Sequence, residues 1–438
     1  MALGLHPECQ GRLREVIAEH LPHIRVTHRM FLDRSTSSML FLAEPIVPQS
    51  GPIRDKLEKY IGEFAAAEFF IEKLSLDLRN QKYDENSESQ PIVELEGYGD
   101  ATKVAGYLVD ELESLPWTYS LTIKLENDFS ALVAKAINAF SLSDSTHLVT
   151  PNNVFIDAFP ITGAPASSVL GFGSLSTLFG GKKWDDKSAY LQISEEGFVG
   201  AYADLAPVER AILKLKSFCG LSIALRLLKV NRTNRAWAWP VKLDLLIHRK
   251  IGTGWELCKA TDIGTEMSET IQDLVINDLD GALQSEESKV AWIRSALDQI
   301  SCVFRSEPKS SKLLLASQWL FDSYCGKNDL LAFVQTAVAM EILLGDKNVS
   351  DLLGLGELLR NRCAYLIGKS HVQREGILAD FKKIYEVRSK IVHRGKSQLT
   401  ADERTLFDKL RWMCRRVIYE EMNLLQQDLA AEKKGVGS

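Results

Sequence analysis

The 438-residue sequence has no stretch of 18 or more apolar residues, so it lacks the signal of a membrane-spanning helix. Residues 1–28 carry acids and histidines, whereas a secretory signal has a basic start followed by an apolar run. We therefore expect a cytoplasmic protein that has no membrane partner.

Paired cysteines are also absent. The seven cysteines are scattered singly and form no C-x-x-C motif, unlike a disulfide framework or a zinc ribbon. His20, His23 and His28 are spaced loosely like metal ligands, but no fourth ligand accompanies them. The glycine-rich stretch that ends at residues 180–183 lacks the G-x4-G-K-[S/T] pattern of a phosphate-binding loop. We expect reduced, mostly buried thiols, no metal and no cofactor.

An excess of positive charge is missing from the chain as a whole, which has a net charge of −6 and so gives no global sign of nucleic-acid affinity. One local segment does have an excess of positive charge. Residues 360–396 contain ten Lys or Arg against three Asp or Glu. This segment is able to form a patch that attracts phosphates.

Length and composition indicate a soluble protein of several domains. The hydrophobic share of 45% and the charged share of 25% are ordinary for globular proteins. Single cores rarely grow beyond about 250 to 300 residues, so two or three domains are expected. The predicted fold class is α+β multidomain, with a mixed α/β N-terminal region followed by an all-α helical bundle.

Residues 1–90 are expected to form a mostly helical segment. Apolar residues recur at spacings of three and four over residues 11–24 and 53–78, and residues 38–42 could form a strand. The polar, turn-forming residues 81–90 are expected to close this segment.

Residues 91–285 are expected to form an α+β domain with a sensing or regulatory role. Strands are predicted at 117–125 and 189–193, and helices at 130–140 and 208–228. A β-hairpin is predicted over 236–260, with its turn at Gly252-Thr253-Gly254. Residues 164–183 are rich in Gly and Ser, which predicts a long mobile loop.

Residues 286–430 are expected to form a helical domain, followed by a disordered tail at 431–438. The apolar periodicity predicts six helices, at 289–304, 311–324, 329–344, 352–367, 374–394 and 401–429.

The most informative of these helices has one apolar stripe. At about 100° per residue, the side chains of Ile377, Ile384, Val387 and Ile391 fall within roughly 80° of one another. This stripe should face the core of the bundle.

A second face of the same helix is polar. Relative to Tyr385, Arg388 lies near about −60°, Ser389 near about +40° and His393 near about +80°. Gly395 is suited to end the helix in the left-handed conformation, which places His393 in the last turn, where the exposed carbonyls favour its charged form. A histidine there can exchange protons with a ribose hydroxyl, and an arginine can hold a phosphate.

The spacing Arg388-x4-His393, in the setting Ile-Tyr-Glu-Val-Arg-Ser-Lys-Ile-Val-His-Arg-Gly, resembles the signature of Apea-like HEPN domains. A tyrosine, an Arg-Ser pair and a Val-His-Gly ending are typical of that family. Residues 337–345, with Glu341, look like its upstream helix, and residues 358–368, with Arg362, look like the helix that follows. Residues 402–425 are similar to its last helix, so the resemblance covers about residues 287–430.

The resemblance implies a metal-independent endoribonuclease in which Arg388 and His393 are catalytic. Ser389, Tyr385 and Glu341 would support them. Two such domains would pair across a two-fold axis, giving a homodimer or a higher even-numbered oligomer, and the ribose 2′-hydroxyl of an RNA substrate would attack its own 3′-phosphate. The RNA backbone would be bound by basic residues of the same segment, namely Lys382, Lys383, Lys390, Arg394 and Lys396.

Plainer interpretations of the same residues stay open. Glu341 either pairs with Arg388 or is an ordinary half-buried helix residue. Tyr385 is more often a packing aromatic than a base-stacking one. Arg388 and His393 could be a solvated face and a dipole partner, and the basic residues a hydrated helix surface.

We expect from this resemblance a regulated, toxin-like ribonuclease that acts in antiviral defence by abortive infection or in a stress response. A phage-derived or stress-derived trigger would act through the upstream region. The alternative is a non-catalytic HEPN module for dimerisation or for nucleotide or RNA binding. A separate enzyme in the N-terminal half is a third possibility, for which the sequence contains no motif.

Overall fold

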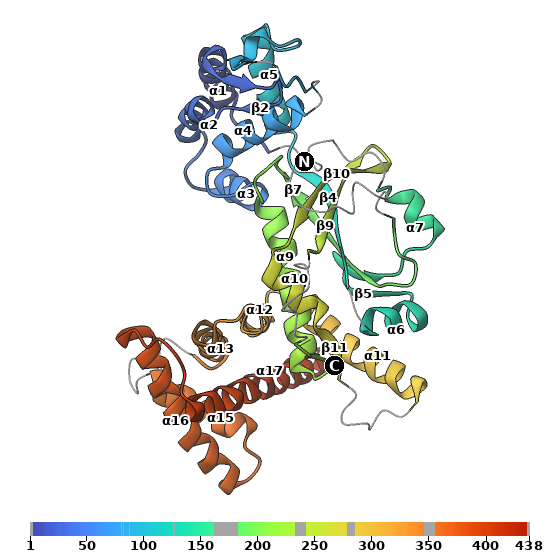
Figure 1. Ribbon diagram of the computed structural model, residues 1–438, viewed down its shortest axis with the longest axis vertical. Helices are drawn as coiled ribbons and strands as arrows, with labels where there is room; N and C mark the ends of the chain where they lie inside the picture. Colours follow the sequence, from blue (N-terminus) through green and yellow to red (C-terminus); the bar gives the residue numbers. More distant parts are fainter. Residues whose placement is uncertain are drawn as a thin grey trace.

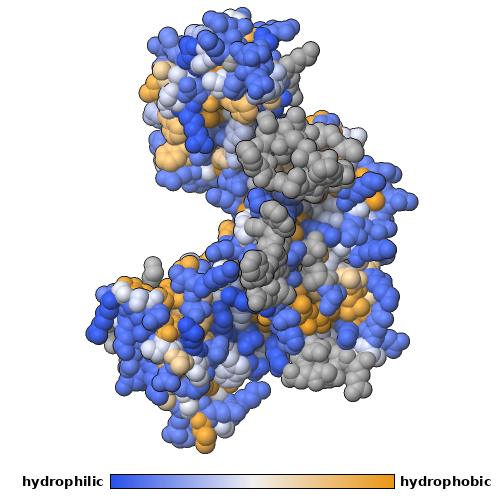
Figure 2. All heavy atoms as spheres, in the orientation of Figure 1, coloured by the Kyte–Doolittle hydropathy of each residue, from blue (hydrophilic) through white to orange (hydrophobic). Residues whose placement is uncertain are grey.

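A computed structural model describes residues 3–79, 81, 83–86, 88–125, 128–161, 183–232, 242–277, 285–345 and 355–435. Over these residues the fold is α+β, as the sequence predicts. Figure 1 shows an N-terminal unit, a six-stranded sheet and a helical bundle arranged in that order. On the face shown in Figure 2, the molecule is hollowed between the N-terminal unit and the bundle.

The N-terminal unit contains short helices around a small three-stranded sheet of order β2-β1-β3. Its elements are α1 (Pro7–His20), η1 (Leu21–His23), β1 (Arg25–Thr27), β2 (Phe31–Leu32), α2 (Arg34–Ser37), η2 (Ser38–Ile46), α3 (Pro52–Tyr60), α4 (Ala65–Leu78), β3 (Gln90–Pro91), η3 (Ile92–Glu94) and α5 (Ala101–Glu113). Strand β3 pairs with β1, and α5 packs against α1, where Arg14 forms an ion pair with Asp110 at 2.8 Å. The unit therefore extends through α5, beyond the predicted boundary at residue 90.

The predicted strand at residues 38–42 is wrong, because this segment begins the 3₁₀ helix η2. Its buried residues are Leu40 and Ala43, three positions apart. That spacing matches the three residues per turn of a 3₁₀ helix rather than the alternation of a strand. The sequence could not distinguish the two spacings, because Phe41 and Leu42 are as apolar as the buried residues although both are exposed.

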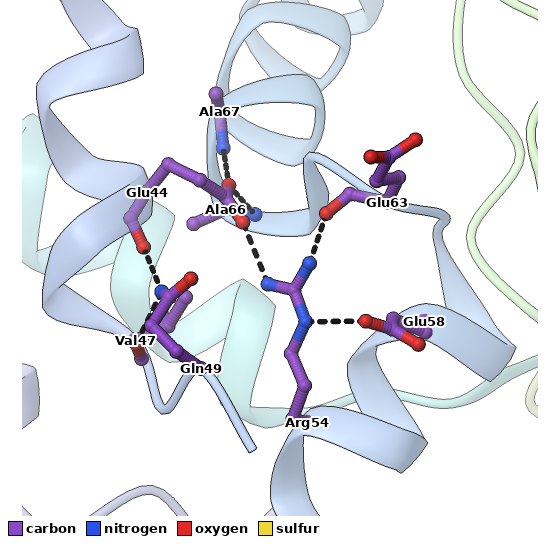
Figure 3. Close-up of polar contacts among 8 residues, drawn as sticks. All are labelled: Glu44, Val47, Gln49, Arg54, Glu58, Glu63, Ala66 and Ala67. Atoms are coloured by element: carbon purple, nitrogen blue, oxygen red, sulfur yellow. Dashed lines mark hydrogen bonds and ion pairs between the residues drawn. The ribbon is translucent and has the colours of Figure 1, made fainter.

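Glu44 and Arg54 form a polar network that fixes how η2, α3 and α4 pack (Figure 3). Glu44 Oε1 accepts a hydrogen bond from Arg54 at 2.8 Å, and Glu44 Oε2 accepts from the backbone N–H groups of Ala66 and Ala67 at the start of α4. Arg54 also contacts Glu58 Oε1 at 2.6 Å. Since the Glu44 and Arg54 side chains are only 13% and 10% exposed, neither can regain water if its partner is lost.

The central sheet has the strand order β10-β9-β4-β7-β6-β5, and all its pairings are antiparallel. Its strands are β4 (Trp117–Lys124), β5 (Ala139–Ser143), β6 (Thr146–Val149), β7 (Tyr190–Gly197), β9 (Asp244–Ile251) and β10 (Gly254–Asp262). The strands predicted near 117–125 and 189–193 are present, and so is the β9–β10 hairpin. Its predicted start at 236–241 and the predicted loop at 164–182 lie outside the described residues.

The predicted helix at 130–140 is too long. Helix α6 (Asp128–Ala136) ends earlier, because Asn138 adopts φ +65° and the chain turns into β5. Asparagine tolerates this left-handed conformation better than most residues do. Strands β5 and β6 were not predicted, because their short segments carry only weak alternation of apolar and polar residues.

Helix α9 (Ala206–Ala224) connects the three parts of the molecule (Figure 1). It packs against α3 and β7 at one end and against α12 and α17 at the other. At Gly220 the α9 backbone approaches α12 so closely that a Cβ would lie 1.9 Å from the carbonyl oxygen of Ser317. Only glycine fits there without moving one of the helices.

Shorter elements complete the middle of the chain. They are α7 (Asn153–Ala158), β8 (Leu228–Val230), α10 (Thr265–Gln272) and β11 (Leu274–Ile276), with β8 and β11 paired in a two-stranded sheet.

The helical bundle follows the sequence prediction closely. Its helices are α11 (Glu286–Arg305), α12 (Ser311–Asp322), α13 (Asp329–Leu344), α15 (Leu355–Ile367), α16 (His371–Arg394) and α17 (Ala401–Gly435). Helix α17 continues to Gly435, so residues 431–435 are helical rather than part of the predicted tail. Glu432 forms an ion pair with Lys309 at 2.6 Å, which favours this extension.

No helix in the described part of the chain is long and apolar enough to cross a membrane. The seven cysteines, all described, are free; Cys219, Cys363 and Cys414 are buried and the other four only partly, so fewer thiols are buried than predicted. Burial raises the pKa of Cys363 and of Cys414 to about 12, so these two thiols are neutral at physiological pH.

Glu44→Ala is expected to lower the free energy of unfolding by about 3 kcal/mol, because it leaves a buried guanidinium without its main partner. Glu58→Ala removes a carboxylate from the same arginine, but this side chain is 52% exposed, so the expected cost is below about 1 kcal/mol. Denaturant unfolding of both variants measures the difference. Equal losses would mean that the Glu44–Arg54 pair does not hold the unit together.

Candidate active site on helix α16

Helix α16 ends at Arg394, as its sequence predicts, but begins at His371 rather than at residue 374, and it buries most of the predicted stripe. Ser370 caps its N-terminus by accepting a hydrogen bond from the backbone N–H of Gln373 at 3.2 Å. Gly395 ends it with φ +62° and ψ +38°, the left-handed conformation expected at this position. Ile377, Ile384 and Val387 of the predicted stripe are buried.

The polar face of α16 carries the predicted site residues at different depths. Tyr385 and Arg388 are half-buried, whereas Ser389 and His393 are exposed. His393 lies in the last turn of the helix, as predicted. An α-helix turns by about 140° and rises by about 7.5 Å over five residues, so Arg388 and His393 diverge on a single helix. Within one copy of the chain they do not face one another.

Glu341 of α13 holds two of these side chains. Arg388 Nη2 donates to Glu341 Oε2 at 3.4 Å, and the Tyr385 hydroxyl donates to Oε1 at 3.4 Å. Arg388 Nε lies 3.3 Å from Oε1, within ion-pair distance, but makes no hydrogen bond among the described residues. Glu341 was expected either to pair with Arg388 or to be an ordinary half-buried helix residue. In the structure it pairs with Arg388. The long distances of this ion pair and the side-chain exposures of 20% and 21% mark it as an orienting contact of modest strength.

Glu341 also acts on the electrostatics of Tyr385. Burial raises the pKa of Tyr385, and the negative charge of Glu341 raises it further, although Arg388 opposes this effect. The hydroxyl therefore stays protonated at neutral pH and can donate to Glu341.

The end of α13, where Glu341 lies, is held by α15. Arg362 Nη1 donates to the carbonyl oxygen of Leu344 at 2.9 Å. This bond satisfies one of the carbonyls left open at a helix C-terminus. The resemblance placed Arg362 in the helix after the Glu341 helix but gave it no role. In the structure it supports the helix that carries Glu341.

A groove of about 350 Å³ lies between α15 and α16 and is lined in part by Lys382, Tyr385 and Ser389. On the α15 side the groove is lined by Gly356 and Arg360, neither of which was predicted from the sequence as a site residue. A Cβ at Gly356 would lie 3.1 Å from Tyr385 Cδ1, so glycine leaves room for the tyrosine ring. Arg360 counted toward the basic segment, but nothing in its spacing marked it as a site residue.

The predicted RNA-binding residues fall into two groups. Lys382, Lys383, Lys390 and Arg394 are exposed and form no ion pair with any other described residue. Lys396 differs, because it is mostly covered and pairs with Glu403 of α17 at 3.0 Å. Its charge is compensated, which makes it the weakest phosphate-binding candidate of the five.

The comparisons with known proteins add nothing to this site. No protein-family model, no curated protein and no solved structure matches the chain.

Glu341→Gln is expected to lower the pKa of Tyr385, because it removes the negative charge that disfavours phenolate formation. It should cost less than about 1 kcal/mol of stability, since the pair is partly solvated. Absorbance titration of the phenolate measures the pKa. Subtracting the curve of a Tyr385→Phe counterpart isolates this residue from the other ten of the eleven tyrosines.

Glu386→Gln is the matched control, because it removes one carboxylate charge from the exposed neighbour of Tyr385. It should leave the Tyr385 pKa unchanged. An unchanged pKa in Glu341→Gln would mean that Glu341 does not set the electrostatics of this face.

Proposed function

We propose that this chain is a metal-independent endoribonuclease of the HEPN type, with Arg388 and His393 as its catalytic residues. The observation that carries the proposal is the polar face of α16. It combines an arginine oriented by Glu341, an exposed histidine in the last helical turn and nearby lysines without ion-pair partners among the described residues. A fixed cation and an accessible imidazole are the two groups that cleavage by a ribose hydroxyl requires.

In the proposed reaction the ribose 2′-oxygen attacks the adjacent phosphorus. A bond forms between this oxygen and phosphorus, and the bond from phosphorus to the 5′-oxygen of the next nucleotide breaks. His393 of one copy accepts the 2′-hydroxyl proton, and the same residue of a second copy protonates the departing 5′-oxygen. The products are a cyclic 2′,3′-phosphate and a free 5′-hydroxyl, while Arg388 stabilises the charge on the phosphate oxygens.

Pairing of two copies is part of the proposal, because Arg388 and His393 diverge on one helix. Val392 gives this idea a second support. It lies between the two catalytic candidates on the polar face of α16 and is 46% exposed. An apolar side chain at this position is consistent with a surface that a second copy covers.

The cellular role that we propose is a toxin-like effector in antiviral defence or a stress response, active in the cytoplasm. The upstream region would control it in response to a phage-derived or stress-derived trigger. Packing of α9 against α12 and α17 supports such control, because a change in the upstream region can reach the bundle through α9.

Arg388→Ala and His393→Ala are each expected to slow RNA cleavage at least about 100-fold, the usual contribution of an electrostatic or acid–base group. Cleavage by the wild type should persist in a metal chelator and yield cyclic phosphate ends, detected by mass spectrometry. Expression of the wild type should be toxic to cells, and both variants should relieve the toxicity.

His371→Ala is the matched control, since His371 lies at the other end of α16 and its side chain is 85% exposed. It should cleave RNA like the wild type. If Arg388→Ala and His393→Ala bind RNA more weakly while no variant, nor the wild type, cleaves it, the chain is a binding module instead. Unchanged cleavage in either variant would reject the assignment of that residue.

Val392→Glu is expected to weaken dimerisation at least about 100-fold. An apolar contact worth about 1.5 kcal/mol or more would be lost twice across a two-fold axis. RNA cleavage should fall with it, although Arg388 and His393 are intact. Sedimentation velocity over a range of protein concentrations measures the association.

Val372→Glu is the control for charge and helix propensity, because Val372 is 77% exposed near the start of the same helix. It should dimerise normally. A Val392→Glu protein that dimerises like the wild type, or a wild type that cleaves RNA as a monomer, would contradict the paired site.

A further inference from the structure

A second cavity lies where the upstream region meets the helical bundle. Its volume is about 1120 Å³. One wall comes from the end of α9, from β8 and from Trp292 of α11, and the other comes from α16 and α17. A molecule bound there would contact both sides of the junction.

The cavity is lined by six Lys or Arg residues and a single carboxylate, Asp380. Asp380 pairs with Lys409 at 2.7 Å, and Arg416 pairs with Glu420 at 2.5 Å. Among the described residues, Arg226, Lys369 and Arg415 have no carboxylate partner. Three cations converging on one cavity without counter-charges favour an anionic ligand that carries several charges.

Aromatic side chains stand beside these cations. Trp292 and Trp412 line the cavity, and Trp412 is 46% exposed. The indole N–H of Trp292 is buried and has no hydrogen-bond acceptor among the described residues. Buried donors are seldom left unpaired, so an acceptor on a ligand would complete this site. Flat rings of this kind provide surfaces on which a base can stack.

Arg226 stands in the position that ends α9, and its backbone has φ +60°. Glycine is the usual residue there, because an L side chain in the left-handed conformation is strained. The Arg226 side chain is exposed and lines the cavity. A strained residue that contributes little to packing indicates that the side chain itself is needed.

We propose that this cavity binds a nucleotide with more than one phosphate, the phosphates contacting Arg226, Lys369 and Arg415 and the base lying against the indole rings. Multiple phosphates match the unpaired cations, and an aromatic base matches the tryptophans. The volume lies near the upper limit of about 1000 Å³ for small-molecule sites, which leaves room for both parts.

This site is distinct from the candidate catalytic face. From α16 it uses Gln373, Gly376, Ile377 and Asp380. Asp380, the nearest of them to Arg388, lies eight residues or about 12 Å along the helix axis from it. The cavity shares no lining residue with the groove beside Tyr385. The inference therefore goes beyond the proposed ribonuclease and does not rest on it.

Isothermal titration calorimetry of the full chain with ATP, GTP, CTP and UTP tests the proposal. At least one nucleotide should bind one site per chain, at least tenfold more tightly than inorganic triphosphate or its own nucleoside, and more weakly as salt is added. Arg415→Ala and Trp412→Ala should each weaken binding at least tenfold, whereas Trp412→Phe should retain most of it. Lys250→Ala, which removes an exposed cation outside the cavity, should bind like the wild type.

Arg226→Gly separates binding from folding. It relieves the backbone strain, so its melting temperature should equal or exceed that of the wild type, while its affinity for the nucleotide should fall at least tenfold. A variant that folds well and binds poorly cannot be dismissed as misfolded.

Three results would overturn the proposal. One is inorganic triphosphate binding as tightly as every nucleotide, which would reduce the site to a charged patch. Another is full affinity in Arg226→Gly and Arg415→Ala. The third is binding of a 12-nucleotide single-stranded RNA, measured with His393→Ala protein, that these variants abolish while no nucleotide binds. Since no experiment here reads RNA cleavage, failure of the ribonuclease proposal would leave these outcomes unchanged.

Discussion

The backbone contact between α9 and α12 at Gly220 and Ser317 is the constraint on which the arrangement of the chain depends. A side chain larger than hydrogen at Gly220 would collide with the Ser317 carbonyl oxygen, so the two helices cross at the closest distance that backbones allow. Around this crossing, Gln318 Nε2 donates to Ser217 Oγ at 3.0 Å, and Lys216 pairs with Asp322 at 2.9 Å. Helix α9 therefore belongs to the core of the bundle as much as to the sheet.

This sharing of α9 has a consequence for how the chain is divided. A cut at residue 285 would uncover the face of α12 that packs on α9. It would also break the bond from Ser301 Oγ of α11 to the Leu142 carbonyl oxygen of β5, at 3.0 Å. The boundary suggested by the change in sequence pattern marks where strands stop, and these contacts cross it. The proposed regulation by the upstream region would need no released domain, because α9 already packs against α12 and α17.

The sequence predicted the bundle well because its helices carry strong local signals. The apolar stripe of α16 and the left-handed Gly395 depend on residues close together in the chain, so periodicity and capping rules could find them. The ion pair from Arg388 to Glu341 spans 47 positions. From the sequence alone, this ion pair was one of two possible roles for Glu341, and the position of Arg360 in the groove was not predicted. Both depend on how the helices pack against one another.

The upstream region was harder to predict for the same physical reason. The 3₁₀ helix η2 and strands β5 and β6 are short, and tertiary contacts decide their form more than local propensity does. The cavity lined by Arg226 is the hardest feature to predict, because its walls come from α9, α11, α16 and α17, which are far apart in the chain. Neither its unpaired cations nor the left-handed conformation of Arg226 leaves a pattern that spacing rules can detect.

The two proposed sites occupy different halves of one helix. Asp380 lines the cavity near the first half of α16, and His393 lies in its last turn. A continuous helix of 24 residues is about 36 Å long and moves as a rigid body more easily than it bends. A ligand that shifts the first half would shift the end as well, and with it the histidine relative to a second copy. Since Glu341 is anchored on α13 rather than α16, the same movement would change the Arg388 contact. Binding in the proposed cavity would therefore alter the geometry of the polar face through the helix itself.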